Sequence, residues 1–172
     1  MGITIHFRLR LREDNALHGL LRAVEQYASA RKWPTRAITE SDVVLQRSSN
    51  IGDWEYQGPS AGIEVLPDEF CDPVRLEFGS DSMAFDFTKT QFAGPSVHRE
   101  VVELLDSLRP YLADVEVEDE GEYWESRDVK LLEYNIATCQ EKIREAMAAR
   151  PNSHGPIRLP SGRWADIISQ VP

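Results

Sequence analysis

Residues 3–11 alternate strictly between apolar and polar side chains. The apolar positions are Ile3, Ile5, Phe7, Leu9 and Leu11, and the polar positions are Thr4, His6, Arg8 and Arg10. Successive side chains of a β-strand point to opposite faces of its sheet. The pattern therefore predicts a half-buried strand with one polar, basic face. That face is either a site for an anion or an acidic partner, or a solvated and salt-bridged sheet surface.

Three segments instead repeat apolar residues at intervals of three and four, the period of an α-helix. They predict helices over 14–32, 96–112 and 126–149. The apolar stripe of the last helix is Val129, Leu132, Ile136, Cys139, Ile143 and Ala146. A stripe of this kind either packs against a sheet or forms the seam of a dimer. Both a monomer and a homodimer are therefore open at this point.

Short apolar runs between turn-forming residues predict the remaining strands. They lie at 43–45, 63–66, 74–78, 83–88 and 115–118. The short Gly79-Ser80-Asp81-Ser82 link predicts a hairpin. Residues 48–62 are rich in Gly, Ser and Pro and are predicted to form a loop, in which Trp54 and Tyr56 pack or bind something.

These elements predict a single α+β domain over residues 1–149. Its mostly antiparallel sheet of about five or six strands is covered by three helices. From residue 150 the composition changes, because the last segment holds four prolines and two glycines. Residues 150–172 are therefore predicted to be an extended C-terminal arm. The arm also carries Trp164 and several aliphatic residues, so we expect it to dock on its own domain or on a neighbour.

Charge narrows the possible partners. The 172 residues include 19 Lys and Arg against 29 Asp and Glu, a net charge of −10. Nucleic-acid binding depends on neutralising phosphates, so we expect no nucleic-acid partner. The segment 101–125 holds nine acidic residues and one basic residue. Such a segment either attracts a basic protein partner or keeps the surface solvated.

The sequence also bears on the compartment. No apolar run approaches the roughly 20 residues that span a bilayer, and the N-terminal residues alternate instead of forming a secretory apolar core. The two cysteines, Cys71 and Cys139, lie far apart and do not make a disulfide framework. We therefore expect a cytoplasmic protein without a membrane partner.

Two segments carry a resemblance. The first is Lys89-Thr90-Gln91-Phe92-Ala93-Gly94-Pro95 followed by His98, and the second is Asp119-Glu120-Gly121-Glu122-Tyr123-Trp124-Glu125. Together they resemble a group of small soluble bacterial proteins that share K-T-Q-aromatic-A-G-P…H and D-E-G-x-Y-W-E segments. The resemblance covers residues 89–125, about a fifth of the chain. It implies a small soluble bacterial protein and no particular activity, because none is assigned to that group.

The same two segments supply the candidate site. If they meet in one cleft, the binding residues are Lys89, Gln91, His98, Glu120, Tyr123 and Trp124. A histidine beside carboxylates is suited to general acid–base catalysis, so the catalytic candidates are His98, Glu120 and Glu125. The alternative is that Gly94-Pro95 merely begins a helix, the aromatic residues cover the core and the charges are solvated.

Other chemistry lacks support in the sequence. The chain has no H-E-x-x-H, paired C-x-x-C or EF-hand pattern, so we expect no metal site. No nucleotide-binding glycine motif and no G-x-S-x-G elbow occurs, so no cofactor is expected. The sequence thus favours a non-enzymatic interaction or regulatory module with an acidic surface for a basic partner, for example one that resembles an immunity protein. The alternative is a small enzyme that uses His98 with Glu120 or Glu125.

Overall fold

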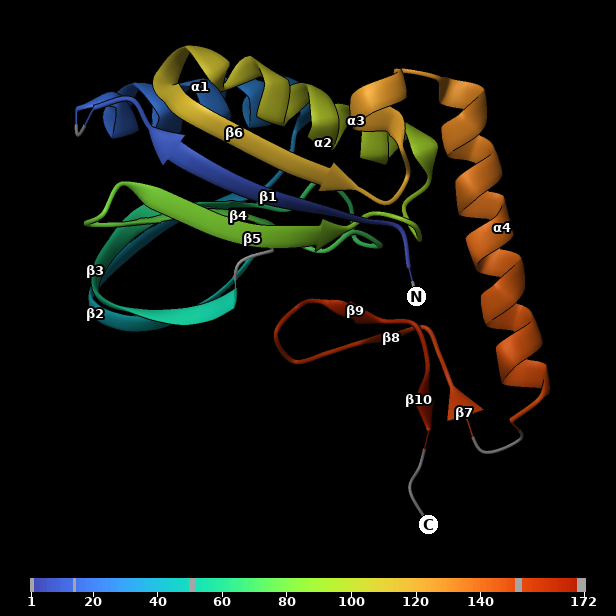
Figure 1. Cartoon of the computed structure of the whole chain (residues 1–172). Coiled ribbons are helices and arrows are strands. Elements are labelled where there is room, and N and C mark those ends of the chain that lie inside the picture. The colour runs from blue at the N-terminus through green and yellow to red at the C-terminus, as the bar shows by residue number, and fades with distance from the viewer. Residues whose placement is uncertain (1, 14, 50–51, 151–152, 170–172) are drawn as a thin grey trace.

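The structure is a computed structural model that describes residues 2–13, 15–49, 52–150 and 153–169 (Figure 1). The described residues form four α-helices, one 3-10 turn and ten strands. The domain elements are β1 (Thr4–Leu11), α1 (Ala16–Arg31), β2 (Thr35–Ser49), β3 (Gly52–Val65), β4 (Val74–Gly79), β5 (Met83–Lys89), α2 (Pro95–Ser107), η1 (Arg109–Tyr111), β6 (Leu112–Asp119), α3 (Tyr123–Ser126) and α4 (Val129–Ala148). The arm holds β7 (Ser153–His154), β8 (Ile157–Arg158), β9 (Trp164–Ala165) and β10 (Ile168–Ser169).

The predicted α+β class is confirmed, but the predicted sheet is wrong. Within the described residues the domain strands form two three-stranded antiparallel sheets, in the orders β5-β1-β6 and β2-β3-β4. The arm adds two two-stranded ladders, β10-β7 and β8-β9. The domain has two small sheets and not one large sheet because the chain changes its strand partner at the turn between β4 and β5. These strands are neighbours in sequence, but β4 pairs with β3 and β5 pairs with β1.

The segment predicted as a loop at 48–62 is instead part of a long hairpin of β2 and β3; positions 50 and 51 lie outside the described residues. Its glycines allow close packing of backbones. A Cβ atom on Gly62 would lie 1.9 Å from the carbonyl oxygen of Leu76 on β4. Trp54 of β3 meets the ring of Phe85 on β5 edge-on, with centroids 5.0 Å apart. The hairpin therefore curves back toward β5 (Figure 1).

The core lies between the β5-β1-β6 sheet and the helices. Ile5, Phe7 and Leu9 of β1 are at most 4% exposed, and they belong to one apolar cluster with Leu20 and Val24 of α1. The predicted strand is confirmed over Thr4–Leu11 with its apolar face buried; on its polar face His6, Arg8 and Arg10 reach the surface, whereas Thr4 is buried. The opposite face of this sheet carries the polar residues of β1 and is called the open face below.

The second and third predicted helices need smaller corrections. The helix expected over 96–112 ends at Ser107, and a 3-10 turn follows at Arg109–Tyr111. Pro110 lacks the amide hydrogen that a continuing α-helix needs. The helix expected over 126–149 begins at Val129, and the short helix α3 before it was not expected. The stripe on α4 packs into the core of its own chain, with Leu132, Ile136 and Cys139 buried.

The arm docks on its own domain, the first of the two alternatives that the sequence left open. The backbone N–H of Trp164 donates to the carboxylate of Asp72 across 2.6 Å. The Trp164 ring lies 5.9 Å from that of Phe70 and 5.7 Å from that of Phe92.

Among the described helices, none combines the length and the apolar character that crossing a membrane requires.

Candidate functional site

His98 lies at a fully buried polar junction between the start of α2, the end of β5 and the end of β6. Its Nδ1 is 2.7 Å from the hydroxyl of Thr90, and its Nε2 is 3.0 Å from a carboxylate oxygen of Asp119. The His98 and Asp119 side chains have no exposed surface. Both ring nitrogens are therefore engaged within the protein. We call His98, Thr90 and Asp119 the buried junction.

Asp119 also organises the turn that follows β6. Its carboxylate accepts hydrogen bonds from the backbone N–H groups of Gly121, Tyr123 and Trp124, at 2.7, 2.9 and 2.9 Å. Burial acts to raise the pKa of Asp119. The hydrogen bond and charge of His98, together with the backbone donors, outweigh burial and hold that pKa below its ordinary value. Asp119 is thus an ionised anchor of this turn.

The predicted acid–base pairs are not in contact. Glu120 is exposed, and its carboxylate accepts a hydrogen bond from the backbone N–H of Thr4 across 2.9 Å. Glu125 is exposed on α3. The carboxylate that reaches His98 is that of Asp119. Because the His98 ring is buried, a solute does not reach it in this conformation, so the acid–base hypothesis stays a prediction without support from this geometry.

Lys89 and Gln91 lie in a different environment, against the C-terminal arm. The Lys89 ammonium and the Gln91 amide each donate to the carboxylate of Asp166, both across 2.9 Å. The Gln91 side-chain oxygen accepts from the backbone N–H of Ile3 at 2.7 Å. These two predicted binding residues therefore hold the arm beside the start of β1.

The two predicted aromatic residues cover the core. Tyr123 is 8% exposed and meets the His98 ring edge-on, with centroids 6.4 Å apart. Trp124 is half-buried, and the guanidinium groups of Arg109 and Arg127 lie 4.9 and 5.2 Å from its ring centre. The two segments that carry the resemblance do meet, but at the buried junction. None of the predicted site residues of these two segments lines the cavity on the other face of the sheet, whereas His6 and Arg8 of the predicted polar strand face do.

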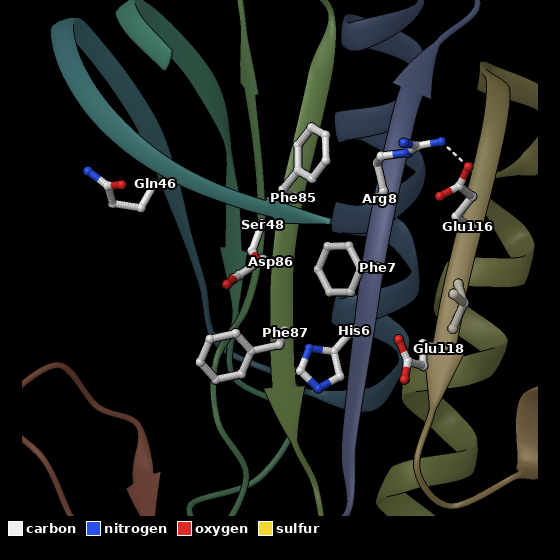
Figure 2. Close-up of a pocket in the computed structure, with 11 residues that line it drawn as sticks. His6, Phe7, Arg8, Gln46, Ser48, Phe85, Asp86, Phe87, Glu116 and Glu118 are labelled. Atoms are coloured by element: carbon white, nitrogen blue, oxygen red, sulfur yellow. Dashed lines mark hydrogen bonds and ion pairs between the residues drawn. The ribbon is translucent and has the colours of Figure 1, made fainter. Parts of the chain in front are cut away.

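The open face carries three parallel rows of side chains. Every second residue of β1 faces this side, so the antiparallel register sets His6 between Phe87 and Glu118, and Arg8 between Phe85 and Glu116. Aromatic residues thus lie along β5, basic residues along β1 and acidic residues along β6 (Figure 2). We call Asp114, Glu116 and Glu118 the acidic row.

A cavity of about 350 Å³ lies on this face. Side chains from all three rows line it, and Gln46 and Ser48 of β2 contribute from the curved hairpin (Figure 2). Phe87, one of the lining residues, is 39% exposed and offers an apolar ring to the solvent side of the cavity. The volume lies at the lower end of the range for binding pockets.

The charges on the open face are unevenly satisfied. Arg8 forms an ion pair with Glu116 (Figure 2) and a second one, at 3.5 Å, with Asp114. Glu118 is exposed and forms no hydrogen bond or ion pair with any described residue. The three carboxylates of the acidic row therefore lie beside Arg8 and Arg10, and that of Glu118 has no ion-pair partner among the described residues.

Arg163 of the arm contacts two residues that line this cavity, Asp86 and Phe87. The Arg163 guanidinium donates to the carboxylate of Asp86 and, across 2.6 Å, to the backbone oxygen of Phe87. It also lies 4.1 Å from the centre of the Phe87 ring. Burial raises the pKa of Asp86, although the nearby Arg163 charge opposes that effect. The docked arm thus holds two residues of the cavity lining, Asp86 and Phe87.

Comparison with protein families, with curated proteins and with solved structures gives no match for this chain. Within the described residues, no group of three or more His, Cys, Asp and Glu side chains is arranged to hold a metal ion.

Sequence reasoning missed most of this cavity. It identified the acidic segment and the polar face of the first strand, but not that the two lie side by side. It missed Gln46 and Ser48 because it ended the strand at residue 45 and began a loop at residue 48, whereas β2 continues to Ser49. The alternation of Trp54 and Tyr56 with polar residues was the available signal for a strand in that segment.

Proposed function

We propose that this protein is a non-enzymatic interaction module whose open face binds a basic segment of another protein. The observation that carries the proposal is the acidic row beside the cavity, with Glu118 free of any described partner. An exposed carboxylate next to a hollow can accept a charged group without first breaking an existing ion pair.

The balance of charge supports a basic partner over an acidic one. Arg8 is already paired with Glu116 and Asp114, so its charge is offset within the face. With Arg10 included, the face still has more acidic than basic groups, because the three carboxylates of the acidic row face two guanidinium groups on β1. The net charge of −10 extends the same sign over the molecule. Such a field raises the rate of encounter with a cationic partner.

The aromatic row supports recognition of long basic side chains. Lys and Arg carry an aliphatic stem that packs on apolar surface and a charged end that stays polar. Phe85 and Phe87 offer such a surface, and Glu118 lies across His6 from Phe87. Arg163 stacks on Phe87 in this chain, which illustrates the affinity of that ring for a guanidinium group.

Binding of a fluorescent hexa-arginine peptide, followed by anisotropy, tests the proposal, with hexa-glutamate as the charge control. The double variant Glu116→Gln/Glu118→Gln removes two exposed charges. We expect about fivefold weaker binding, equivalent to about 1 kcal/mol for two exposed ion pairs. We also expect weaker binding for the unmodified protein at about 0.5 M NaCl, because salt screens exposed charges.

The matched control is Glu133→Gln/Glu145→Gln, which removes the same charge from exposed positions on α4. It should bind hexa-arginine as the unmodified protein does. An equal loss in both double variants would show that the peptide responds only to net charge. That outcome, or no binding by the unmodified protein, would overturn the proposal.

A further inference from the structure

The backbone of β6 presents a free edge. The backbone N–H of Glu120 donates to the oxygen of Thr4 across 3.1 Å, which fixes the phase of the β1–β6 ladder. In an antiparallel pair, residues alternate between bonding the partner and pointing away from it. The backbone N–H and C=O groups of Glu116 and Glu118 therefore bond to β1. The same groups of Val115 and Val117 point outward.

The opposite edge of this sheet, along β5, is closed. Three of its outward carbonyl oxygens accept hydrogen bonds from elsewhere in the chain. The Met83 oxygen accepts from Arg47 at 3.0 Å, the Phe87 oxygen from Arg163 at 2.6 Å, and the Lys89 oxygen from the backbone N–H of Asp72 at 2.9 Å. The protein thus covers one edge of the sheet with its own groups.

No comparable cover lies along β6. In the sheet order β5-β1-β6, none of the described strands pairs with its outer side (Figure 1). The described residues place no hydrogen-bonding group on the outward N–H and C=O groups of Val115 and Val117. An open strand edge is a template for pairing with another chain.

The side chains along this edge define which strand fits. Asp114, Glu116 and Glu118 project on the open face, and Val115 and Val117 pack, half-buried, on the other side. A strand with an acidic row disfavours pairing with acidic strands and favours basic residues directly opposite. The chain already contains one strand of that kind, since β1 reads His-Phe-Arg-Leu-Arg where it pairs with the inner edge of β6.

We infer that the basic segment binds by strand addition, extending the β5-β1-β6 sheet at the outer edge of β6. The segment alternates Arg or Lys with apolar residues over about five positions. Its basic side chains lie opposite the acidic row, and its apolar side chains lie opposite Val115 and Val117. This inference rests on the proposed function and uses its acidic row; the aromatic row lies on β5, which β6 and β1 separate from the added strand.

Hydrogen exchange measured by NMR tests the mode of binding, with the peptide Arg-Val-Arg-Val-Arg, capped at both ends, as the probe. At a peptide concentration about ten times its Kd, exchange of the Val115 and Val117 amides should slow about tenfold. The Glu116 and Glu118 amides are bonded to β1 in the free protein and serve as internal controls. Unchanged exchange at both valines with bound peptide would overturn strand addition.

Modified peptides supply a test that needs no change in the protein. In antiparallel addition, the peptide valines lie opposite Val115 and Val117 and donate their N–H groups to β6. N-methylation of both valines should weaken binding at least about tenfold, whereas N-methylation of the first and last arginines should have little effect. Equal affinity of the two methylated peptides would overturn strand addition.

The variant Val117→Pro tests the same point from the protein side. Proline is tolerated on an edge strand where the lost N–H faces outward. The variant should keep its circular dichroism spectrum and bind the alternating peptide at least about fivefold more weakly. If Glu116→Gln/Glu118→Gln still weakens the binding of hexa-arginine while the exchange, methylation and proline tests contradict strand addition, the proposed function stands and strand addition does not. If neither peptide binds, the proposed function itself falls.

Discussion

Glu118 and Asp119 are neighbours on β6 and carry the same charge, but their side chains lie on opposite faces of the sheet. Asp119 is buried, with hydrogen bonds from three backbone groups and a contact with His98. Glu118 is exposed on the open face and has no described partner. A step of one residue along a strand thus separates a carboxylate that stabilises the fold from one that is available for binding.

The difference shows what surroundings do to one functional group. A buried carboxylate without donors would be very unfavourable, so its partners must be supplied by the fold. An exposed carboxylate keeps its hydration and costs little without a partner. We therefore expect changes at the buried junction to alter stability, and changes in the acidic row to alter binding.

The largest expected effect is that of Asp119→Ala. The change leaves the N–H groups of Gly121, Tyr123 and Trp124 without their acceptor and removes the partner of His98. We expect the free energy of unfolding to fall by about 3–5 kcal/mol. Urea denaturation measures the loss, and a loss below about 1 kcal/mol would contradict the anchoring role of Asp119.

A smaller effect is expected for Thr90→Val, which replaces the hydroxyl facing His98 by a methyl group of similar size. The loss of the 2.7 Å hydrogen bond to Nδ1 should lower the free energy of unfolding by about 1–2 kcal/mol. The NMR signals of the His98 ring should also shift. Unchanged stability together with an unchanged ring spectrum would show that this contact does not hold the ring.

The junction should also give the fold a dependence on pH. Because the pKa of Asp119 is lower in the folded state, its contribution to stability is present above its unfolded pKa of about 3.9 and is lost as pH falls through the folded pKa. The stability difference between the unmodified protein and Asp119→Asn should shrink on acidification to about pH 2.5. A constant difference across that range would contradict this assignment.

Asp86 should show the opposite sign. Burial raises its pKa in the folded state, so its ionised form disfavours folding. This unfavourable contribution is present above the folded pKa and is relieved as pH falls through it toward the unfolded value. The unmodified protein should therefore gain stability from this group on mild acidification, and Asp86→Asn should lack that gain. Urea denaturation over the same pH range measures the difference. An unaltered pH profile in this variant would count against the burial of an ionised Asp86.

The smallest effect on stability is expected for Glu118→Gln. The side chain is exposed and without a described partner, so the free energy of unfolding should change by no more than about 0.5 kcal/mol. The affinity for hexa-arginine should nevertheless fall about twofold. A clear loss of stability in this variant would remove the contrast with Asp119.

Part of this arrangement was predictable from local pattern. The alternation at residues 3–11 predicts β1 and both of its faces, and the apolar stripe at 126–149 predicts α4 to within about three residues at its start. The charge count at 101–125 identifies the segment that supplies the acidic row. Each of these signals is carried by residues that are close in sequence.

Local sequence pattern did not predict which side chains meet in the candidate site. Sequence reasoning selected His98 and looked for its acid at Glu120 or Glu125, but the structure places Asp119 against the ring. Alternation along β6 separates Asp119 from Glu118 and Glu120, and only the pairing of β6 with β1 determines which set faces inward. The loop prediction at 48–62 failed for a similar reason, since Gly62 serves close contact with β4 and not a turn.

The sequence by itself determined the α+β class, the two faces of β1, the position of the long helix and the concentration of negative charge. These follow from periodicity and composition, which act over a few residues. Tertiary structure decided that two small sheets form, that His98 is buried, and that the acidic row lies beside an aromatic row and an open strand edge. Those outcomes depend on strand pairing between distant segments, which joins residues that no local pattern relates.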